Sequence, residues 1–480
     1  MGQIVKIEIE TLLHRLVEMS YEAHIGRRDT DRAVAADALR APMPAWQRDG
    51  QQAAMVEARR RMLRTGQWSD TQFMGRRWPI GCVALEITQR CNLDCTACYL
   101  SETSEAVKDL PIQEVLRRID RIFEHYGPYT DVQVTGGDPT LRKREELIEI
   151  VRRIRQRGMR PTLMTNGIRA TRDLLRKLAE AGLVDVTFHV DLTQQRRGFA
   201  SEVALNAIRQ EYIERARGLG LAVMFNTTVF AGNIAEIPAV VAFFIANSDI
   251  VRLASFQITA DTGRTVPGLH DGRLNIASIK SQIELGASTT LSFDTMHIGH
   301  SQCNRYAMAA VVNGTAYDVL DDPELVRCVL ERTAHLQFDR QSRLKAVAAL
   351  ARGLVGSPSL AMRASIWLAR KVWLARRELV RARGRVNKLS FFIHNFMGAC
   401  SLEQARIDAC VFAAATQAGP ISMCLHNAMR DAFILDPIPM EGDRFWNPLF
   451  GTVTTRPEPG RPGRVPDSKP RRRPKREKEG

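Results

Sequence analysis

The sequence predicts an α/β protein built on a partial (β/α)6 TIM-like barrel, with an N-terminal helical segment and an α+β C-terminal auxiliary region. Residues 82–258 alternate six strand-like runs with five helical runs, which is typical of a parallel sheet covered by helices. Right-handed crossovers curl such a sheet into a full or partial barrel. The unusual glycine and polar motifs of this stretch follow the strands, at the end where such folds hold their active sites.

The strands and helices of the barrel follow from the spacing of apolar residues along the chain. The expected strands are 83–88, 131–135, 162–165, 184–190, 222–229 and 251–257. The expected helices are 112–126, 144–157, 172–181, 202–219 and 237–247. Beyond the barrel we expect a hairpin over 308–319 turning at Asn313-Gly314, helices within 340–386 and a strand-like piece at 433–435.

Four regions result from these patterns. They are an N-terminal helical segment (1–78), a core barrel (79–260), a C-terminal extension with an auxiliary metal site (261–450) and a disordered basic tail (451–480). The first region shows helical spacing near 4–25 and 44–64 and carries no visible chemistry.

The charge of the chain is concentrated in two segments. The formal net charge is +15, but residues 361–388 hold nine Lys/Arg and one Glu, and residues 456–480 hold ten Lys/Arg and four acidic residues. The rest of the chain is close to neutral, so a nucleic-acid partner is not expected. No apolar run is long enough to span a membrane, and the first ten residues lack a signal-peptide pattern. We therefore expect a cytoplasmic protein.

Three of the nine cysteines form a compact motif after the first strand, Cys91-Asn-Leu-Asp-Cys95-Thr-Ala-Cys98. Three thiolates can bind one face of a cubane cluster and leave its fourth iron open. A structural zinc site is the alternative, but such sites prefer four closed ligands, usually in paired C-x2-C units. The spacing favours an iron–sulfur cluster.

This loop resembles the signature of the radical S-adenosylmethionine (radical SAM) superfamily, C-x3-C-x-aromatic-C. It differs because Ala97 precedes the last cysteine and the aromatic Tyr99 follows it. Further matches stand at later strand ends. They are Gly136-Gly137-Asp138 where the family carries its GGE motif, Asn166 in a Thr-Asn-Gly turn, His189 and Asp191 after the fourth strand, and Asn226 on the fifth.

The resemblance implies a [4Fe–4S] cluster held by Cys91, Cys95 and Cys98. It also implies that S-adenosyl-L-methionine is bound by Gly136, Gly137, Asp138, Asn166, His189, Asp191 and Asn226. In this family the reduced cluster cleaves SAM to methionine and a 5′-deoxyadenosyl radical, which takes a hydrogen atom from an unactivated carbon. An electron donor such as flavodoxin or ferredoxin is then required. No catalytic side chain is assigned, and a non-catalytic iron–sulfur scaffold stays open because of Ala97 and Asp138.

A second group of cysteines lies in the C-terminal region. Cys303, Cys400, Cys410 and Cys424 resemble the ligands of SPASM or twitch extensions, which implies a second iron–sulfur cluster. The alternative is that they are separate buried cysteines, as we expect for Cys82 and Cys328. The nearby residues His297, His300, His394 and His426 are candidate replacement ligands.

The helical run 366–385 combines tryptophans and aliphatic residues with arginines, which is typical of a helix on an anionic membrane surface. The alternative is the solvated face of an ordinary helix. The segments 390–397 and 424–427 loosely resemble the radical SAM branch that contains archaeal tetraether lipid synthase. Together they favour a lipid substrate and peripheral association at the inner membrane face. A peptide or a pterin-like small molecule is the alternative substrate.

Overall fold

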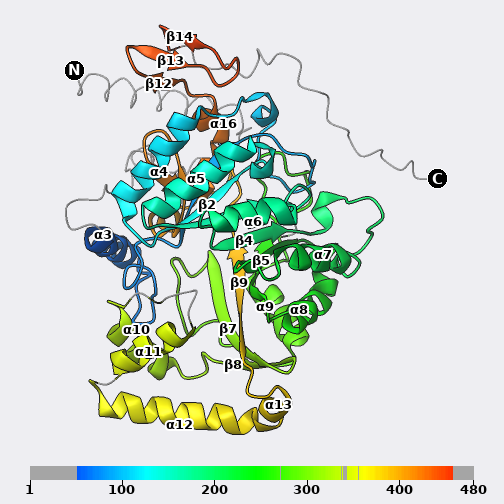
Figure 1. Cartoon of the computed structure of the whole chain (residues 1–480), viewed down its shortest axis with the longest axis vertical. Helices are drawn as coiled ribbons and strands as arrows, with labels where there is room; N and C mark the ends of the chain where they lie inside the picture. The colour runs from blue at the N-terminus through cyan, green and yellow to red at the C-terminus, as the bar shows by residue number, and fades with distance from the viewer. Residues whose placement is uncertain (1–50, 271, 337, 339–342, 355, 458–480) are drawn as a thin grey trace.

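The computed structural model describes residues 51–457 except 271, 337, 339–342 and 355 (Figure 1). Within this part of the chain, most strands belong to one sheet, in the order β11-β10-β1-β2-β3-β4-β5-β6-β9-β7-β8. Its strands are β1 (Cys82–Thr88), β2 (Asp131–Gly136), β3 (Arg160–Thr165), β4 (Asp185–His189), β5 (Ala222–Val229), β6 (Val251–Ile258), β7 (Asn304–Val312), β8 (Thr315–Asp318), β9 (Asn387–Asn395), β10 (Phe412–Ala415) and β11 (Pro420–Ser422).

Helices cover the outside of this sheet, and further helices follow it in the C-terminal part (Figure 1). They are α3 (Gln51–Arg64), α4 (Ile112–Tyr126), α5 (Arg144–Gln156), α6 (Arg172–Glu180), α7 (Asn206–Ala216), α8 (Ile237–Ala246), α9 (Ile276–Ala287), α10 (Pro323–Thr333), α11 (Arg343–Leu354), α12 (Pro358–Leu374), α13 (Arg376–Arg381), α14 (Gln404–Asp408), α15 (Met423–Ala428) and α16 (Arg430–Ile434). A small separate sheet contains β12 (Ile438–Met440), β13 (Arg444–Trp446) and β14 (Val453–Thr454).

The predicted α/β fold is confirmed. Strands β1 to β6 run parallel and alternate with helices, as the sequence pattern indicated. Helix α7 begins at Asn206, later than the predicted residue 202, because Glu202 is buried in the preceding turn and bonds to the Leu192 amide and to Arg209.

The C-terminal region extends both edges of the barrel sheet. Strand β9 pairs parallel with β6, and the β7–β8 hairpin continues that edge. Strand β10 pairs parallel with β1 at the other edge. The predicted boundary at residue 260 therefore falls inside one continuous sheet. The two edges approach through side chains, since the Phe392 and Phe412 rings lie 6.0 Å apart.

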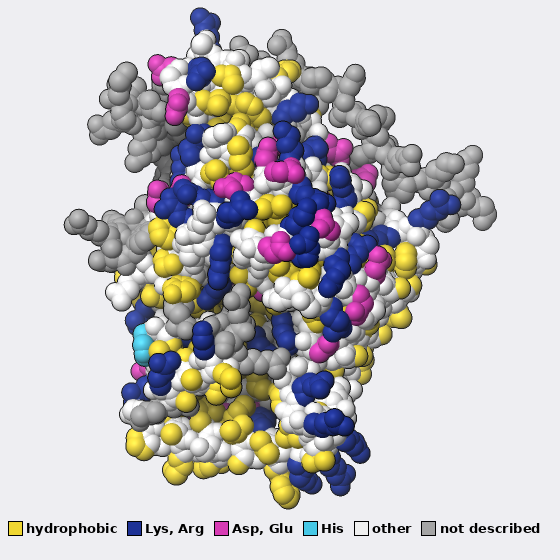
Figure 2. Space-filling model, in the orientation of Figure 1, with side chains coloured by type: hydrophobic (Ala, Val, Ile, Leu, Met, Phe, Trp, Pro, Cys, Tyr) yellow, Lys and Arg dark blue, Asp and Glu magenta, His cyan; other side chains and the backbone are white. Residues whose placement is uncertain are grey.

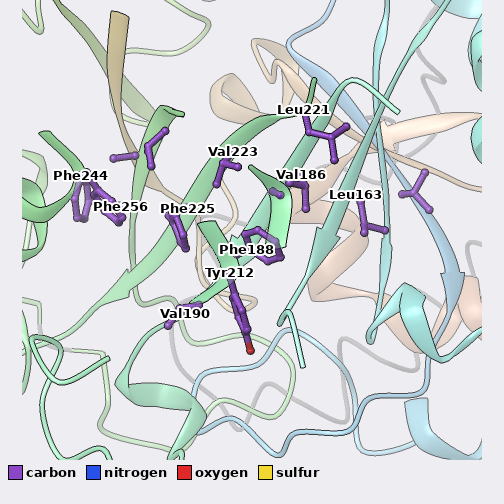
Figure 3. Close-up of a cluster of buried hydrophobic side chains, with 14 of the residues drawn as sticks. Leu163, Val186, Phe188, Val190, Tyr212, Leu221, Val223, Phe225, Phe244 and Phe256 are labelled. Carbon is purple, nitrogen blue, oxygen red and sulfur yellow. The ribbon is translucent and has the colours of Figure 1, made fainter. Parts of the chain in front are cut away.

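Strand alternation separates the packing face of the barrel from its interior. Phe188 on β4 and Phe225 on β5 point outward, where they meet Tyr212 of α7 and Phe244 of α8 at ring distances of 4.9 and 5.1 Å (Figure 3). Their neighbours along the strands point to the opposite face. The barrel interior is therefore lined by side chains such as those of Thr187, His189, Asn226 and Gln257.

Two smaller predictions have different outcomes. The hairpin at 308–319 is confirmed as β7 and β8, with positive φ at both Asn313 (51°) and Gly314 (78°) as a tight hairpin turn requires. The strand-like piece at 433–435 is wrong. A three-residue apolar run carries no periodicity, and Phe433 belongs to α16, where its ring stacks 5.3 Å from that of His426.

The ends of the chain are described only in part. Helix α3 lies within the predicted helical run 44–64, while the predicted helix at 4–25 lies outside the described residues. Within the tail predicted from 451, β14 pairs with β13, and residues 458–480 lie outside the described part. None of the helices between residues 51 and 457 is both long and apolar enough to cross a membrane.

Candidate functional site

The cysteine loop leaves the C-terminal end of β1 and is fixed by backbone bonds to two other strand ends. The Thr96 amide donates to the Thr193 carbonyl after β4 at 2.8 Å. The Val266 amide, after β6, donates to the Thr96 carbonyl at 2.8 Å. The Cys98 amide donates to Thr265 Oγ1 at 3.2 Å. The loop is thus held across the end of the barrel.

Glycines allow the neighbouring loops to approach this loop at backbone distance. A Cβ on Gly137 would lie 2.1 Å from the Arg90 carbonyl oxygen. A Cβ on Gly263 would lie 2.6 Å from the Cys98 carbonyl oxygen, and this residue also has a positive φ of 57°. Neither contact leaves room for a side chain, so the glycines after β2 and β6 are required to cradle the cysteine loop.

The three thiols lie close enough to influence one another. Burial, assisted by Asp138 and Cys98, raises the pKa of Cys91 to about 11. Burial, with Cys98 as the next cause, also raises the pKa of Cys95. Cys91 and Cys95 therefore keep their protons at neutral pH and would release them on binding iron.

A cation accompanies the thiols. Burial opposes the charge of Arg264, but the Cys98 sulfur and the Glu105 carboxylate raise its pKa. Its Nη1 donates to Glu105 at 2.6 Å. A cluster with three thiolate ligands is anionic, and Arg264 supplies a fixed positive charge beside it.

The side chains of the cysteine loop are arranged for an iron–sulfur cluster and not for a single metal ion. As the side chains stand between residues 51 and 457, no three His, Cys, Asp or Glu converge on one point as ligands of a single metal ion. A cubane binds each thiolate on a different iron and so needs more widely spaced ligands. Three free thiols on one loop, the glycine cradle and Arg264 fit such a cluster.

Asp138 is fully buried, and its carboxylate accepts hydrogen bonds from neighbouring parts of the chain. Its Oδ1 accepts from the Thr140 amide at 3.0 Å, and its Oδ2 accepts from Thr165 Oγ1 and the Asn166 amide at 2.8 Å each. The Asn166 side chain in turn donates to Asn92 at 2.6 Å and to the Cys91 sulfur at 3.9 Å. The GGD loop therefore positions the third strand end and, through it, the cysteine loop.

His189 and Asp191 form a pair at the end of β4. His189 Nε2 lies 2.6 Å from Asp191 Oδ2 and 3.1 Å from Thr228 Oγ1. Burial alone would lower the pKa of His189, but Asp191 raises it above its usual value. Despite burial, His189 lowers the pKa of Asp191 to about 2. Each partner thus favours the charged form of the other, in the barrel interior.

Asn226 lies beside this pair in strand register. Its position on β5 faces His189 on β4 and Ser255 on β6, and its Nδ2 donates to Gln257 Oε1 at 3.3 Å. Six of the seven predicted SAM-site residues thus lie at the ends of β2, β3 and β4, and Asn226 lies inside β5 level with the end of β4. Their assignment to SAM binding stays a prediction.

Sequence reasoning missed a group that joins the C-terminal region to this site. Arg430, fully buried on α16, donates to Glu86 Oε2 at 2.7 Å and to the Tyr99 carbonyl at 2.9 Å, and lies 4.6 Å from the centre of the Tyr99 ring. The Tyr99 hydroxyl donates to the Gly136 carbonyl at 2.5 Å. The tyrosine displaced from the family pattern therefore links the cysteine loop to the GGD loop. A buried glutamate in the middle of an apolar strand was the available signal.

Three of the four predicted auxiliary cysteines lie together, and the fourth lies apart from them. Cys303, Cys410 and Cys424 line one pocket together with His300. Burial, followed by the proximity of Cys410, raises the pKa of Cys424 to about 12. Cys400 is exposed and does not line this pocket. Of the four candidate replacement histidines, which the structure all describes, His300 alone lines it.

Two further cysteines were predicted to be core residues. Cys82 is buried on β1, which confirms its prediction. The prediction for Cys328 is wrong, because this residue is only partly buried on α10, where its thiol faces Glu324.

Residues 85–244 match the family model of the Radical SAM superfamily. The 7,8-dihydro-6-hydroxymethylpterin dimethyltransferase of Methanocaldococcus jannaschii is 29% identical over 207 residues, covering 42% of this chain and 40% of that protein. A probable GTP 3′,8-cyclase of Pyrococcus abyssi is 31% identical, covering 38% and 58%. The PqqA peptide cyclase of Bradyrhizobium diazoefficiens is 31% identical, covering 36% and 46%. The chain thus matches about half the length of these curated relatives.

Among solved structures, methylornithine synthase (PylB) is 17% identical with a TM-score of 0.34, covering 58% of this chain and 77% of that chain. Streptococcus suis SuiB bound to the precursor peptide SuiA is 15% identical with a TM-score of 0.34, covering 59% and 57%. The family match spans β1 to α8, and the cysteine loop, the GGD loop and the His189–Asp191 pair all lie within it. Residues 85–244 therefore form a radical SAM domain, and members of this superfamily use a [4Fe–4S] cluster and S-adenosylmethionine.

Proposed function

We propose that this protein is a radical SAM enzyme that removes a hydrogen atom from an unactivated carbon of its substrate. The observation that carries the proposal is the loop of Cys91, Cys95 and Cys98, held across the ends of the parallel strands beside Arg264. When bound, the cluster and SAM would supply a 5′-deoxyadenosyl radical. The protein's own part is to hold, orient and shield these groups.

Each neighbouring loop has a separate task in this proposal. Cys91, Cys95 and Cys98 bind three irons, and Arg264 offsets the negative charge of their thiolates. The Gly136-Gly137 backbone would bind the methionine end of SAM, with Asp138 fixing that loop from behind. His189, Asp191 and Asn226 face the interior two and three strands further on, where they would orient the nucleoside end.

The test is anaerobic purification, cluster reconstitution and incubation with SAM and dithionite. We expect 5′-deoxyadenosine to form and the electron paramagnetic resonance of the reduced cluster to change on adding SAM. Cys91→Ala, Cys95→Ala and Cys98→Ala should each abolish both signals. Cys328→Ala, on α10 outside the site, is the matched control and should retain them. A wild-type protein with a full cluster and neither signal would contradict the proposal.

The substrate is the finer part of the proposal. The matched relatives are named for a pterin, GTP and a peptide, which favours a small molecule or a peptide in the barrel. The exposed apolar residues of α12 favour a lipid instead. Deuterated candidates of each class distinguish them, because only the true substrate transfers deuterium to 5′-deoxyadenosine. The electron donor is identified by testing whether a flavodoxin or a ferredoxin supports the reaction in place of dithionite.

We also propose a second cluster in the pocket of Cys303, Cys410 and Cys424, with His300 as the candidate fourth ligand. His300 takes the place of Cys400 in the predicted ligand set, because Cys400 is exposed outside the pocket. Reconstituted protein should contain twice the iron of a one-cluster enzyme. Removing Cys303 should halve the iron without removing the SAM-sensitive signal. An unchanged iron content would contradict the second cluster and leave the first proposal intact.

A further inference from the structure

The helices α12 and α13 form an arm at one end of the molecule, with apolar side chains turned to solvent (Figures 1 and 2). Met362, Ile366 and Trp373 are 64–66% exposed, and Val380 on α13 is 80% exposed. Large apolar side chains are seldom this exposed over a continuous surface unless something binds there. We call the exposed face of Met362, Ile366 and Trp373, with its flanking arginines, the α12 surface.

The orientation of α12 is fixed by its opposite face. Trp367 Nε1 donates to Asp321 Oδ1 at 2.9 Å, and Lys371 pairs with the same carboxylate at 2.8 Å. Leu360 is buried on this side. Met362, Ile366 and Trp373 follow a spacing of four and seven residues, which places them on one stripe of the helix. This stripe faces solvent because the anchored face already packs on the protein.

Positive charge borders the apolar stripe. Residues 361–388 contain nine Lys/Arg and one Glu. Arg376 lies 4.1 Å from the centre of the Trp373 ring, which holds the guanidinium beside the exposed apolar surface. Arg377, Arg383 and Arg385 form no ion pair with other residues that the structure describes, and all three are exposed. The acidic residues nearby, Asp321 and Asp322, are already paired on the anchored side.

We propose that the α12 surface binds the headgroup region of an anionic lipid bilayer. A helix that presents tryptophan and aliphatic side chains on one stripe, with arginines at its borders, lies in the membrane interface without crossing it. The apolar stripe enters between the lipids, and the arginines bind phosphate groups. A protein partner would need an acidic and apolar groove, whereas a bilayer matches both features over the length of the arm.

The arm lies away from the proposed SAM site. Helix α13 leads into the N-terminal end of β9, and the cysteine loop lies at the C-terminal ends of the parallel strands. Membrane binding would therefore place the enzyme on a surface without using the residues of its active site. The proposal stands or falls separately from the radical SAM activity.

The experiment is flotation of the full-length protein with vesicles of phosphatidylcholine containing phosphatidylglycerol. We expect the protein to float with these vesicles and to bind vesicles of phosphatidylcholine alone about tenfold more weakly. The variant Ile366→Glu/Trp373→Glu should lose binding by about a hundredfold. Arg376→Glu/Arg377→Glu should lose it by about tenfold or more. Added salt should weaken binding of the wild type because it screens the arginines.

Matched controls place the same changes elsewhere on the surface. Leu285→Glu on α9, where the side chain is 65% exposed, and Lys143→Glu before α5 should leave flotation unchanged. All variants should retain cleavage of SAM, which shows that they fold. Equal flotation of the wild type and Ile366→Glu/Trp373→Glu would overturn the proposal. A wild-type dimer that this variant converts to a monomer, with no flotation of either, would identify the surface as an interface between two copies instead.

Discussion

Asp138 stands where the family more often has glutamate, and the structure gives its carboxylate a role that can be measured. It is fully buried between the GGD loop and the end of β3. It accepts hydrogen bonds from the amides of Thr140 and Asn166 and from the hydroxyl groups of Thr140 and Thr165. Asp138→Ala would remove these acceptors together. The two hydroxyl groups of this region can rotate toward other acceptors, but the two backbone amides cannot.

The expected loss of stability follows from those two amides. A buried donor left without a partner costs about 1–3 kcal/mol, so Asp138→Ala should lower the free energy of unfolding by about 4 kcal/mol. Asp138→Asn keeps the shape but turns a donor toward one of the amides, at a cost of about 2 kcal/mol. Asp138→Glu adds a methylene to a fully buried position, which costs about 1–3 kcal/mol.

Urea unfolding of the cluster-free protein measures these differences. A second measurement follows the cysteine loop, because Asn166 bonds to Asn92 and Cys91. Asp138→Ala should therefore lower cluster occupancy after reconstitution, while Asp138→Glu should retain more of it. Asp173→Ala, on the exposed face of α6, is the control. It should cost less than about 1 kcal/mol of unfolding free energy, because its ion pairs are exposed, and should leave cluster occupancy unchanged. An unfolding midpoint of Asp138→Ala equal to that of the wild type would refute the reasoning.

Three further predictions concern a buried ion pair, a buried carboxyl group and the auxiliary cysteines. Glu202 and Arg209 form a fully buried ion pair, so Glu202→Gln should cost about 3–5 kcal/mol of unfolding free energy. The double variant Glu202→Leu/Arg209→Leu should cost less than the sum of the two single changes, and additive losses would contradict this. Burial raises the pKa of Asp436 to about 6 from its ordinary 3.8. The folded state then holds this proton more tightly, so stability should fall by up to about 3 kcal/mol as the pH rises from 4 to 6. Asp436→Asn should remove that fall, and identical profiles of thermal midpoint against pH would refute it. Cys410→Ala should lower the iron content of reconstituted protein and Cys400→Ala should not, whereas equal losses would show that Cys400 is a ligand.

The six barrel strands were predictable because each has its own local signal. Each is a short run rich in apolar residues, and helical runs separate each strand from the next. Strands β9 and β10 have no such context. Strand β10 (Phe412–Ala415) contains three alanines and forms a strand because β1 offers a free edge for pairing. Pairing between segments more than 300 residues apart leaves no periodic trace in either.

The residues of the candidate functional site were also predictable only in part. Cys91, Cys95 and Cys98 were predictable because one short loop carries all three, so their spacing alone describes the site. Arg430 was not, since its partner Glu86 lies 344 positions away. The auxiliary cysteines show the same limit. Cys400 and Cys410 are equivalent in sequence, and only the path of the chain after β9 separates them.

The pocket of Cys303, Cys410 and Cys424 has a particular place in this barrel. Cys303 precedes β7, and its carbonyl accepts from the Asn395 amide at the end of β9, so it belongs to one edge of the sheet. Cys410 precedes β10 and belongs to the other edge. These edges share no strand pairing and meet through side chains such as Phe392 and Phe412. A cluster bound here would join the two edges covalently, so its loading should stabilise barrel closure. We therefore expect iron at this pocket to raise the unfolding midpoint of a protein that lacks the SAM-site cysteines, and an equal midpoint with and without iron would contradict a role of the cluster in barrel closure.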